Sequence, residues 1–329
     1  MNMQEEVSKK PSIIWKLIYI IVIIATIVVI LILVYYIYLN LPRNPQQLEI
    51  NNNPNFQTPI TSTVNQFYPN MKFNHNKLTY FIDQNCNLNR KSRMEQAFVE
   101  LSTKVPIISF FMSEVNPDIE ISCTLNNRVD KDEKHFVAGE GGAKEIIQTG
   151  NYNIITDGII LLYENSKVKS KDCIYPNVEI HELLHVLGFD HSEDKKSIMY
   201  PVIESCDQVL DTSITDQLKT LYAQENLADV YFDQIEVTKK GRYIDFNLTI
   251  KNSGSIKSEK ISLTILDGTN IIEQRNLGDL DFGAGITLTT TNLRLKRLNP
   301  DQINFILDKE NSIKELDEDN NVANIKLQN

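Results

Sequence analysis

The segment HELLHVLGFDH, at residues 181–191, holds three of the five histidines of this 329-residue chain. On an α-helix, residues i and i+4 lie on one face, so His181 and His185 can direct their imidazoles at a single metal ion. Gly188 tolerates a positive φ and ends the helix, which lets the chain turn back and bring His191 to the same point. Three histidine ligands leave one tetrahedral position for water, which is typical of a catalytic zinc site.

Glu182 lies one position round the predicted helix, where it can reach a water on the ion without binding the ion itself. We therefore expect one catalytic Zn²⁺ on the three histidines, with Glu182 as the general base in peptide hydrolysis. A lone histidine is usually a surface or core residue, and we predict that His75 and His135 are not catalytic. Five fixed positions would arise by chance only at a frequency on the order of a few in a million.

Met199 stands eight residues after His191, and the string HELLHVLGFDHSEDKKSIMYP, at residues 181–201, resembles the matrixin branch of the metzincin proteases. The resemblance covers about residues 75–226. It implies an α+β, zincin-like catalytic domain in which Met199 forms an apolar floor beneath the zinc. It also raises a structural calcium site near residues 139–142 as an expectation.

The sequence departs from the matrixin pattern in two ways. It has no P-R-C-G-x-P-D string, so we do not expect latency through a pro-segment cysteine. Vertebrate-type matrixins hold a structural zinc through several upstream histidines, whereas only His135 is available in that region here. We therefore predict that this second zinc site is absent.

The run LIYIIVIIATIVVILILVYYIYL, at residues 17–39, contains 23 residues without a charge. As a helix it would span roughly 35 Å, enough to cross a hydrocarbon core of about 30 Å. A signal peptide has a shorter apolar region that ends in small residues, whereas this run ends in tyrosines and a leucine. Three lysines precede the run, and Arg43 alone follows closely. Because positive charges stay on the cytoplasmic side, we predict a single-pass cell-membrane protein with a cytoplasmic tail at residues 1–16 and a transmembrane helix at residues 17–39. The rest of the chain is then extracellular.

The four cysteines agree with an extracellular location, where disulfides persist. None lies in a C-x-x-C pair, and four cysteines allow three pairings. Among these we favour Cys86–Cys123 with Cys173–Cys206, because the second bond brackets the candidate active-site segment.

The remaining sequence divides into three parts. Residues 40–74 are rich in Asn, Pro, Gln and Thr and predict a flexible stalk. Residues 75–227 predict the catalytic domain, with strands at 78–82, 107–111, 118–122 and 158–164, helices at 91–104, 177–187 and 215–224, and a turn or loop at 139–142. We expect an extended substrate to pair with an edge strand formed by Ile159, Ile160, Leu161 and Leu162.

Residues 228–329 alternate apolar and polar side chains, as in YIDFNLTI at 243–250, and predict a β-sandwich of about 100 residues. KNSGS, at residues 251–255, and LDKENSIKELDEDNNVANIKL, at residues 307–327, resemble the CARDB module. That resemblance implies an immunoglobulin-like, adhesion-related domain. The Asp and Glu residues of the second string are candidate calcium ligands, although such charges more often lie in a solvated turn. The matched positions are Asp308, Asn311, Glu315, Asp317, Asn320 and Asn321.

The net charge of −10 argues against a nucleic-acid partner, which requires a basic face. The sequence thus predicts a membrane-anchored, extracellular zinc endopeptidase that acts on proteins or peptides, with a surface partner for the C-terminal domain. The alternative is a surface adhesion protein with a vestigial peptidase domain, which the intact motif with Glu182 disfavours. An intramembrane protease is set aside because the motif lies about 140 residues beyond the apolar run.

Overall fold

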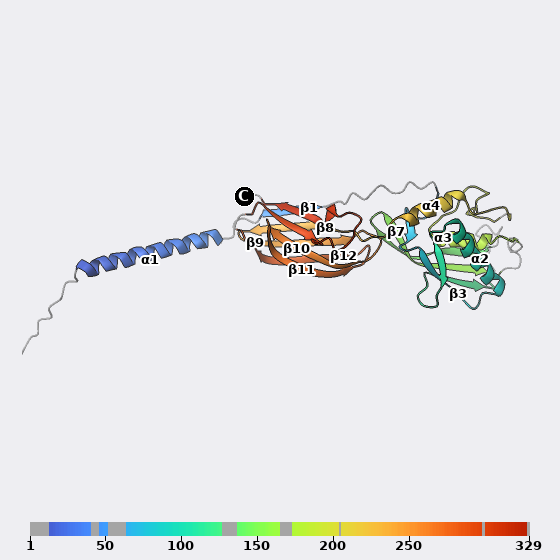
Figure 1. Cartoon of the computed structure of the whole chain (residues 1–329), viewed down its shortest axis with the longest axis horizontal. Helices are drawn as coiled ribbons and strands as arrows, with labels where there is room; N and C mark the ends of the chain where they lie inside the picture. Colours follow the sequence, from blue (N-terminus) through green and yellow to red (C-terminus); the bar gives the residue numbers. More distant parts are fainter. Residues whose placement is uncertain are drawn as a thin grey trace, which may run out of the picture.

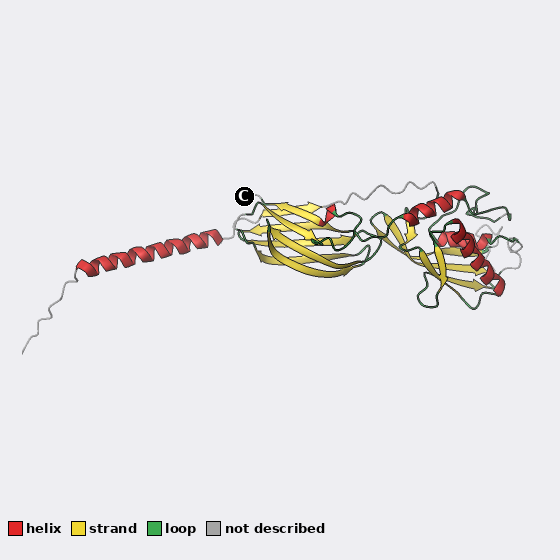
Figure 2. Cartoon of the chain, in the orientation of Figure 1, coloured by secondary structure: helices red, strands yellow, loops and turns green. Residues whose placement is uncertain are grey.

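The computed structural model describes residues 13–40, 46–51, 64–126, 137–164, 173–203, 205–297 and 300–327. Along the chain these residues form an apolar helix, an α/β domain and an all-β sandwich (Figures 1 and 2). His135 and residues 41–45 and 52–63 of the predicted stalk lie outside the described residues.

The N-terminal helix α1, Ile13–Asn40, contains the whole predicted transmembrane run. Its large apolar side chains from Ile13 to Tyr38 are exposed all round the helix. A helix that is hydrophobic on every face has no polar side to turn to water. The length and composition of α1 therefore fit a membrane span or a signal anchor.

The α/β domain is built on one six-stranded sheet, in the order β2-β7-β5-β3-β4, with β6 antiparallel to β7 and the other pairs parallel. The strands are β2 Met71–Phe73, β3 Lys77–Ile82, β4 Ser109–Met112, β5 Ile119–Thr124, β6 Gly139–Thr149 and β7 Tyr152–Tyr163. The helices are α2 Leu88–Lys104, α3 Asn177–Val186 and α4 Thr212–Ala223. Helix α3 contacts α2, β6 and β7, so the zinc motif packs against both the sheet and its covering helix.

Helix α2 illustrates why the predicted helices form. The Asn87 side chain caps its start by accepting a 2.9 Å hydrogen bond from the Arg90 backbone N–H. Its buried apolar side chains, Met94, Ala97, Phe98 and Leu101, recur at helical spacing and are at most 4% exposed.

The predicted turn at residues 139–142 is wrong, because these residues begin strand β6. The predicted edge strand is wrong for a related reason. Ile159, Ile160, Leu161 and Leu162 pair with β5 on one side and with β6 on the other, so they lie inside the sheet. A continuous apolar run is what a strand with neighbours on both sides requires. The edge on this side of the sheet is β6.

The sandwich consists of two antiparallel four-stranded sheets, β1-β8-β9-β12 and β11-β10-β13-β14. The alternation predicted for residues 243–250 is confirmed, since Ile244, Phe246, Leu248 and Ile250 are at most 2% exposed in the core between the sheets. The strands and the short 3₁₀ helix η2 are β1 Gln46–Asn51, β8 Val230–Lys240, β9 Tyr243–Asn252, β10 Ser258–Asp267, β11 Asn270–Leu280, β12 Gly285–Arg294, β13 Gln302–Leu307, η2 Asp319–Asn321 and β14 Val322–Lys326.

The predicted stalk at residues 40–74 is wrong at two places. Strand β1 pairs along its whole length with β8, so it belongs to the sandwich. Residues 64–74 belong to the α/β domain, where the Phe67 backbone N–H donates to the Gly188 carbonyl at 3.0 Å and β2 joins the sheet. Both segments are polar in composition, and their long-range partners supply the backbone hydrogen bonds that order them.

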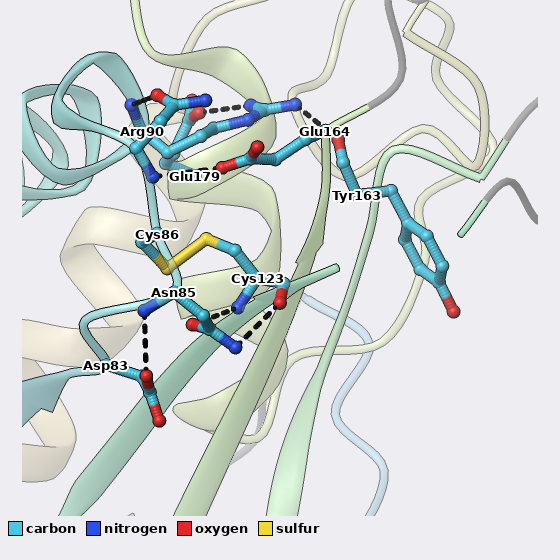
Figure 3. The surroundings of a disulfide bond; sticks show 9 residues. Asp83, Asn85, Cys86, Arg90, Cys123, Tyr163, Glu164 and Glu179 are labelled. Atoms are coloured by element: carbon cyan, nitrogen blue, oxygen red, sulfur yellow. Dashed lines mark hydrogen bonds and ion pairs between the residues drawn. A yellow bond between two sulfur atoms is a disulfide. The ribbon is translucent and has the colours of Figure 1, made fainter. Parts of the chain in front are cut away.

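The structure contains the disulfides Cys86–Cys123 and Cys173–Cys206, the pairing that we favoured from the sequence. Figure 3 shows that the first bond joins the chain before α2 to strand β5. The Asn85 side chain reinforces this link, because it donates to the Cys123 carbonyl at 2.9 Å and accepts from the Cys123 N–H at 3.2 Å. The second bond joins the segment before α3 to the loop that precedes α4.

Candidate active site

The three motif histidines meet at one point. The Nε2 atom of His185 lies 3.0 Å from Nε2 of His181 and 3.2 Å from Nε2 of His191. Ligands at about 2.0–2.1 Å from a tetrahedral zinc would lie roughly 3.3 Å apart, so these separations fit such an ion. Within the described ranges, this trio is the one group of at least three His, Cys, Asp or Glu side chains that could hold a metal ion.

The other ring nitrogens of the first two histidines determine their tautomers. Nδ1 of His181 lies 2.7 Å from the Ile198 carbonyl oxygen, and Nδ1 of His185 lies 2.8 Å from the Phe189 carbonyl oxygen. A carbonyl can only accept, so in each neutral ring the proton is on Nδ1 and the Nε2 lone pair is available. Carbonyl partners of this kind orient metal-binding histidines. The residues present therefore fit a zinc ion.

Burial keeps these rings in the form that binds a metal. Desolvation is the largest cause that lowers the pKa of His181 to about 3 and the pKa of His185 to about 4. It also lowers the pKa of His191, which is more exposed. At neutral pH all three imidazoles are thus uncharged, as a metal ligand must be.

Glu182 lies beneath the start of strand β6 and is 5% exposed. A Cβ atom at Gly139 would lie 2.6 Å from Cγ of Glu182, and one at Gly141 would lie 2.8 Å from its backbone carbonyl carbon. At Gly141 the clash is with backbone and only glycine fits, whereas at Gly139 a larger residue would displace the Glu182 side chain. Burial is the largest cause that raises the pKa of Glu182 to about 8, while a hydrogen bond from the Gly141 backbone acts to lower it. The two glycines of β6 thus set the position of the candidate base.

Met199 is fully buried, and the turn that carries it is hydrogen-bonded to the loop that follows His191. The Ser192 N–H donates to the Met199 carbonyl at 2.8 Å, and the Met199 N–H donates to Oγ of Ser197 at 3.0 Å. Ser197 Oγ in turn donates to the Asp211 carboxylate at 2.6 Å, just before α4. Because the neighbouring Ile198 carbonyl holds His181, this turn also orients a candidate ligand.

The structure contains a buried charge cluster on α3 that we did not predict from the sequence. Glu179, two residues before His181, has no exposed surface and is paired with Arg90 and Arg93 of α2. Figure 3 shows its contact with Arg90. Arg90 donates to Glu179 at 2.6 Å and to the Tyr163 carbonyl at 2.8 Å, and Arg93 donates to the Cys173 carbonyl at 2.7 Å. The cluster fixes the start of α3 against α2 and β7.

An aromatic side chain borders the histidine trio. The ring of Phe67 lies 5.6 Å from the ring of His185, centroid to centroid, and remains 44% exposed. The segment that carries it runs beside the zinc-binding loop, since the Asp190 N–H donates to the Asn65 carbonyl at 3.0 Å. His75, by contrast, lies outside the trio and bonds to Asp118 through Nε2 at 3.2 Å.

Two of the candidate calcium ligands in the sandwich, Asp308 and Glu315, accept hydrogen bonds from protein donors. Asp308 accepts from Ser312 Oγ at 2.6 Å and from the Ile313 N–H at 2.7 Å, which closes a turn. Glu315 accepts from the Val230 N–H at 2.9 Å and from the Asn321 amide. These contacts hold the last loop of the sandwich against the start of β8. Residues 139–142, where the matrixin resemblance raised a calcium site, pair with β7 and contact α3.

Comparisons with known proteins agree with this architecture. Residues 72–223 match the family model for matrixin, of the M10 peptidases, and residues 230–325 match the family model for CARDB. The chain therefore carries a matrixin domain followed by a CARDB domain, which confirms both resemblances. A matrixin domain places residues 72–223 in a metallopeptidase family.

Two solved structures are similar to the sandwich. They are a crystal structure of the CARDB domain of the PF1109 protein from Pyrococcus furiosus in complex with di-metal ions, and a solution NMR structure of the same domain. Each is 20% identical to this chain and covers 31% of it, with a TM-score of 0.26, and the match spans 88% and 95% of those two chains. No curated protein matches this chain.

Proposed function

We propose that this protein is a zinc-dependent endopeptidase, anchored in a membrane by α1, with its matrixin and CARDB domains on the outer side. One observation supports the chemistry above all others. Three Nε2 atoms converge within 4.8 Å, two of their rings are oriented by backbone carbonyls, and Glu182 neighbours them in the sequence and the helix.

Each residue of the site has a distinct role in this proposal. Zinc bound to the three histidines would polarise the scissile carbonyl and lower the pKa of a bound water toward about 7. Glu182 would act as the general base that takes a proton from the attacking water and passes it to the leaving amine. Met199 closes the apolar side of the site, and its turn holds His181 in place. The matrixin match supports these assignments at the level of the family.

We place the substrate on strand β6 in place of the edge strand that the sequence suggested. Among the described strands, β6 pairs with β7 alone, so its other edge can accept an extended peptide. Gly139 and Gly141 lie at the part of β6 next to Glu182. Their lack of side chains lets a substrate backbone approach closely.

The test combines metal content with cleavage. The purified full chain is expected to hold one zinc per molecule by mass spectrometry of the metal and to cleave casein, with activity lost on chelation and restored by zinc. Glu182→Gln is expected to keep its zinc and lose nearly all cleavage, whereas His185→Ala is expected to lose both. Glu193→Gln, an exposed glutamate near the same loop, is the matched control and is expected to remain active. An active Glu182→Gln variant would rule out the assignment of the base.

A second candidate function is surface adhesion with an inactive peptidase domain, which the CARDB match favours because this module is consistent with a binding role. Zymography separates the two functions, since a vestigial domain would leave casein intact even when loaded with zinc. Calcium is a further proposal for the sandwich. It predicts that millimolar calcium raises the unfolding temperature of the full chain and that Asp317→Asn removes the effect.

A further inference from the structure

Strand β1 determines which end of the sandwich faces the anchor. It starts at Gln46, six residues after α1 ends at Asn40. In its antiparallel pairing with β8, Gln46 lies opposite Lys239 and Asn51 lies opposite Gln234. The anchor therefore joins the sandwich at the C-terminal end of β8, where the chain turns into β9.

The α/β domain contacts the opposite end of the sandwich. The chain enters the sandwich at Val230, which pairs with Asn252 at the end of β9. Thr149, at the tip of the β6–β7 hairpin, is buried there and donates to the Gly254 carbonyl at 2.8 Å. A second turn of the sandwich lies against the same hairpin, because a Cβ at Gly283 would be 2.7 Å from Cγ2 of Ile147.

A buried polar network holds the two domains together at this junction. Lys72 of β2 is fully buried and donates to the Leu221 carbonyl at 3.1 Å and to Oδ1 of Asn226 at 2.9 Å. Ser255, in the sandwich turn, donates to the same Asn226 oxygen at 3.2 Å. Buried polar groups that are this fully paired favour one arrangement over others. Figure 1 shows the resulting order of helix, sandwich and α/β domain in space.

We propose that the sandwich is a membrane-proximal spacer and that the peptidase domain, although it comes first along the chain, works at the far end of that spacer. This inference rests on the proposed membrane anchor and deepens the proposed function. A strand as long as β8, which has 11 residues, spans about 35 Å. The accessible substrates are therefore soluble proteins and the raised parts of surface proteins, and segments close to the bilayer are excluded.

An energy-transfer measurement tests the placement without relying on activity. The full chain is reconstituted in vesicles that contain acceptor-labelled lipid, with a donor dye on Lys296→Cys or on Val99→Cys. Both positions are exposed, and Lys296 lies at the anchor end because its neighbour Leu295 donates to the Arg242 carbonyl beside the β8–β9 turn. We expect strong transfer from position 296 and weaker transfer from position 99, since the sandwich adds about 35 Å. Equal transfer from both positions would overturn the proposal.

A pair of membrane-bound reporters tests the consequence for substrates. Both carry the same cleavable peptide, one within about five extended residues of the bilayer, or less than about 20 Å, and one raised on a rigid spacer of about 40 Å. We expect the raised reporter to be cleaved at least about tenfold faster, because a tethered site acts only where it can reach. Faster cleavage of the low reporter, or equal rates, would contradict the proposal.

A strand-breaking variant provides the matched control for the reporters. Leu48→Pro with Glu49→Pro removes a donor from the β1–β8 ladder, because one of two adjacent residues in an antiparallel pair donates across it, and is expected to bring the two reporter rates together. A soluble peptide is expected to be cleaved at the wild-type rate by this variant. Absence of soluble-peptide cleavage by the wild type would count against the proposed function, while the energy-transfer result would still decide the placement.

Discussion

A single methyl group on strand β6 tests how closely this edge strand sets the position of Glu182, the proposed catalytic base. In Gly141→Ala the new Cβ would lie 2.8 Å from the carbonyl carbon and 2.9 Å from the Cα of Glu182, where ordinary contact begins at 3.4 Å. Both are backbone atoms of a buried helix, so a rotamer change cannot relieve the clash. Either β6 or α3 must move by about 0.6 Å or more.

That displacement sets the expected size of the effect. A misplacement of about 1 Å can reduce a rate by about 10²-fold, so we expect kcat/KM of Gly141→Ala to fall by about that factor, or about 2.7 kcal/mol of transition-state stabilisation. The zinc content is expected to stay at the wild-type level, because the histidines are fixed by carbonyls elsewhere. Peptide cleavage, metal analysis and circular dichroism on the same sample separate these effects.

The adjacent glycine provides the control. A Cβ at Gly142 would meet nothing within 4 Å, so Gly142→Ala makes the same chemical change in open space. We expect it to keep a kcat/KM within a few-fold of the wild type. If Gly141→Ala were as active as Gly142→Ala, close packing of β6 on Glu182 would not be what positions the base.

Three further predictions address the rest of the chain. Glu179→Ala leaves its two arginine partners buried without a counter-charge and is expected to lower the free energy of unfolding by about 3–5 kcal/mol in urea, against less than about 0.5 kcal/mol for the exposed Glu193→Ala. Burial is the largest cause that raises the pKa of Glu315 to about 7 from 4.5, so its contribution to stability is complete below about pH 4.5 and is lost as the pH rises through 7. The free energy of unfolding of the wild type is expected to fall between pH 5 and pH 8. A Glu315→Gln variant whose free energy of unfolding fell equally steeply with pH would refute this. Glu49→Cys with Glu236→Cys is expected to form a disulfide under oxidation, because directly opposed strand residues lie within bonding range, and failure to cross-link would argue against the register of β1.

The features that could be predicted from the sequence are those whose signal is local. The zinc helix follows from three histidines and a glycine at fixed spacing, and the sandwich strands follow from a period of two. The start of β6 could not be predicted, because Gly139-Glu140-Gly141-Gly142 has low β propensity. The reason for these glycines lies in helix α3, because larger side chains at Gly139 and Gly141 would collide with Glu182.

The other errors share that cause. Strand β1 is ordered by β8, which lies about 180 residues further along the chain, and nothing within QQLEIN indicates that partner. The apolar run at residues 159–162 did carry the right signal, for a strand covered on both sides, but we read it as an edge. The pairing of Glu179 with two arginines of α2 leaves no pattern in the sequence, because it joins helices about 90 residues apart.

The two disulfides bear on when, during biosynthesis, the proposed active site takes its final form. Cys173–Cys206 ties the strand-to-helix connection before the histidines to the loop beyond the methionine turn, and Cys86–Cys123 ties the chain before α2 to the central sheet. Thiols stay reduced in the cytosol, so under the proposed outward topology a newly made chain acquires these ties only after its globular part has left that compartment. The proposed peptidase site would then take its final form only outside the cytosol, away from the proteins of the cell interior.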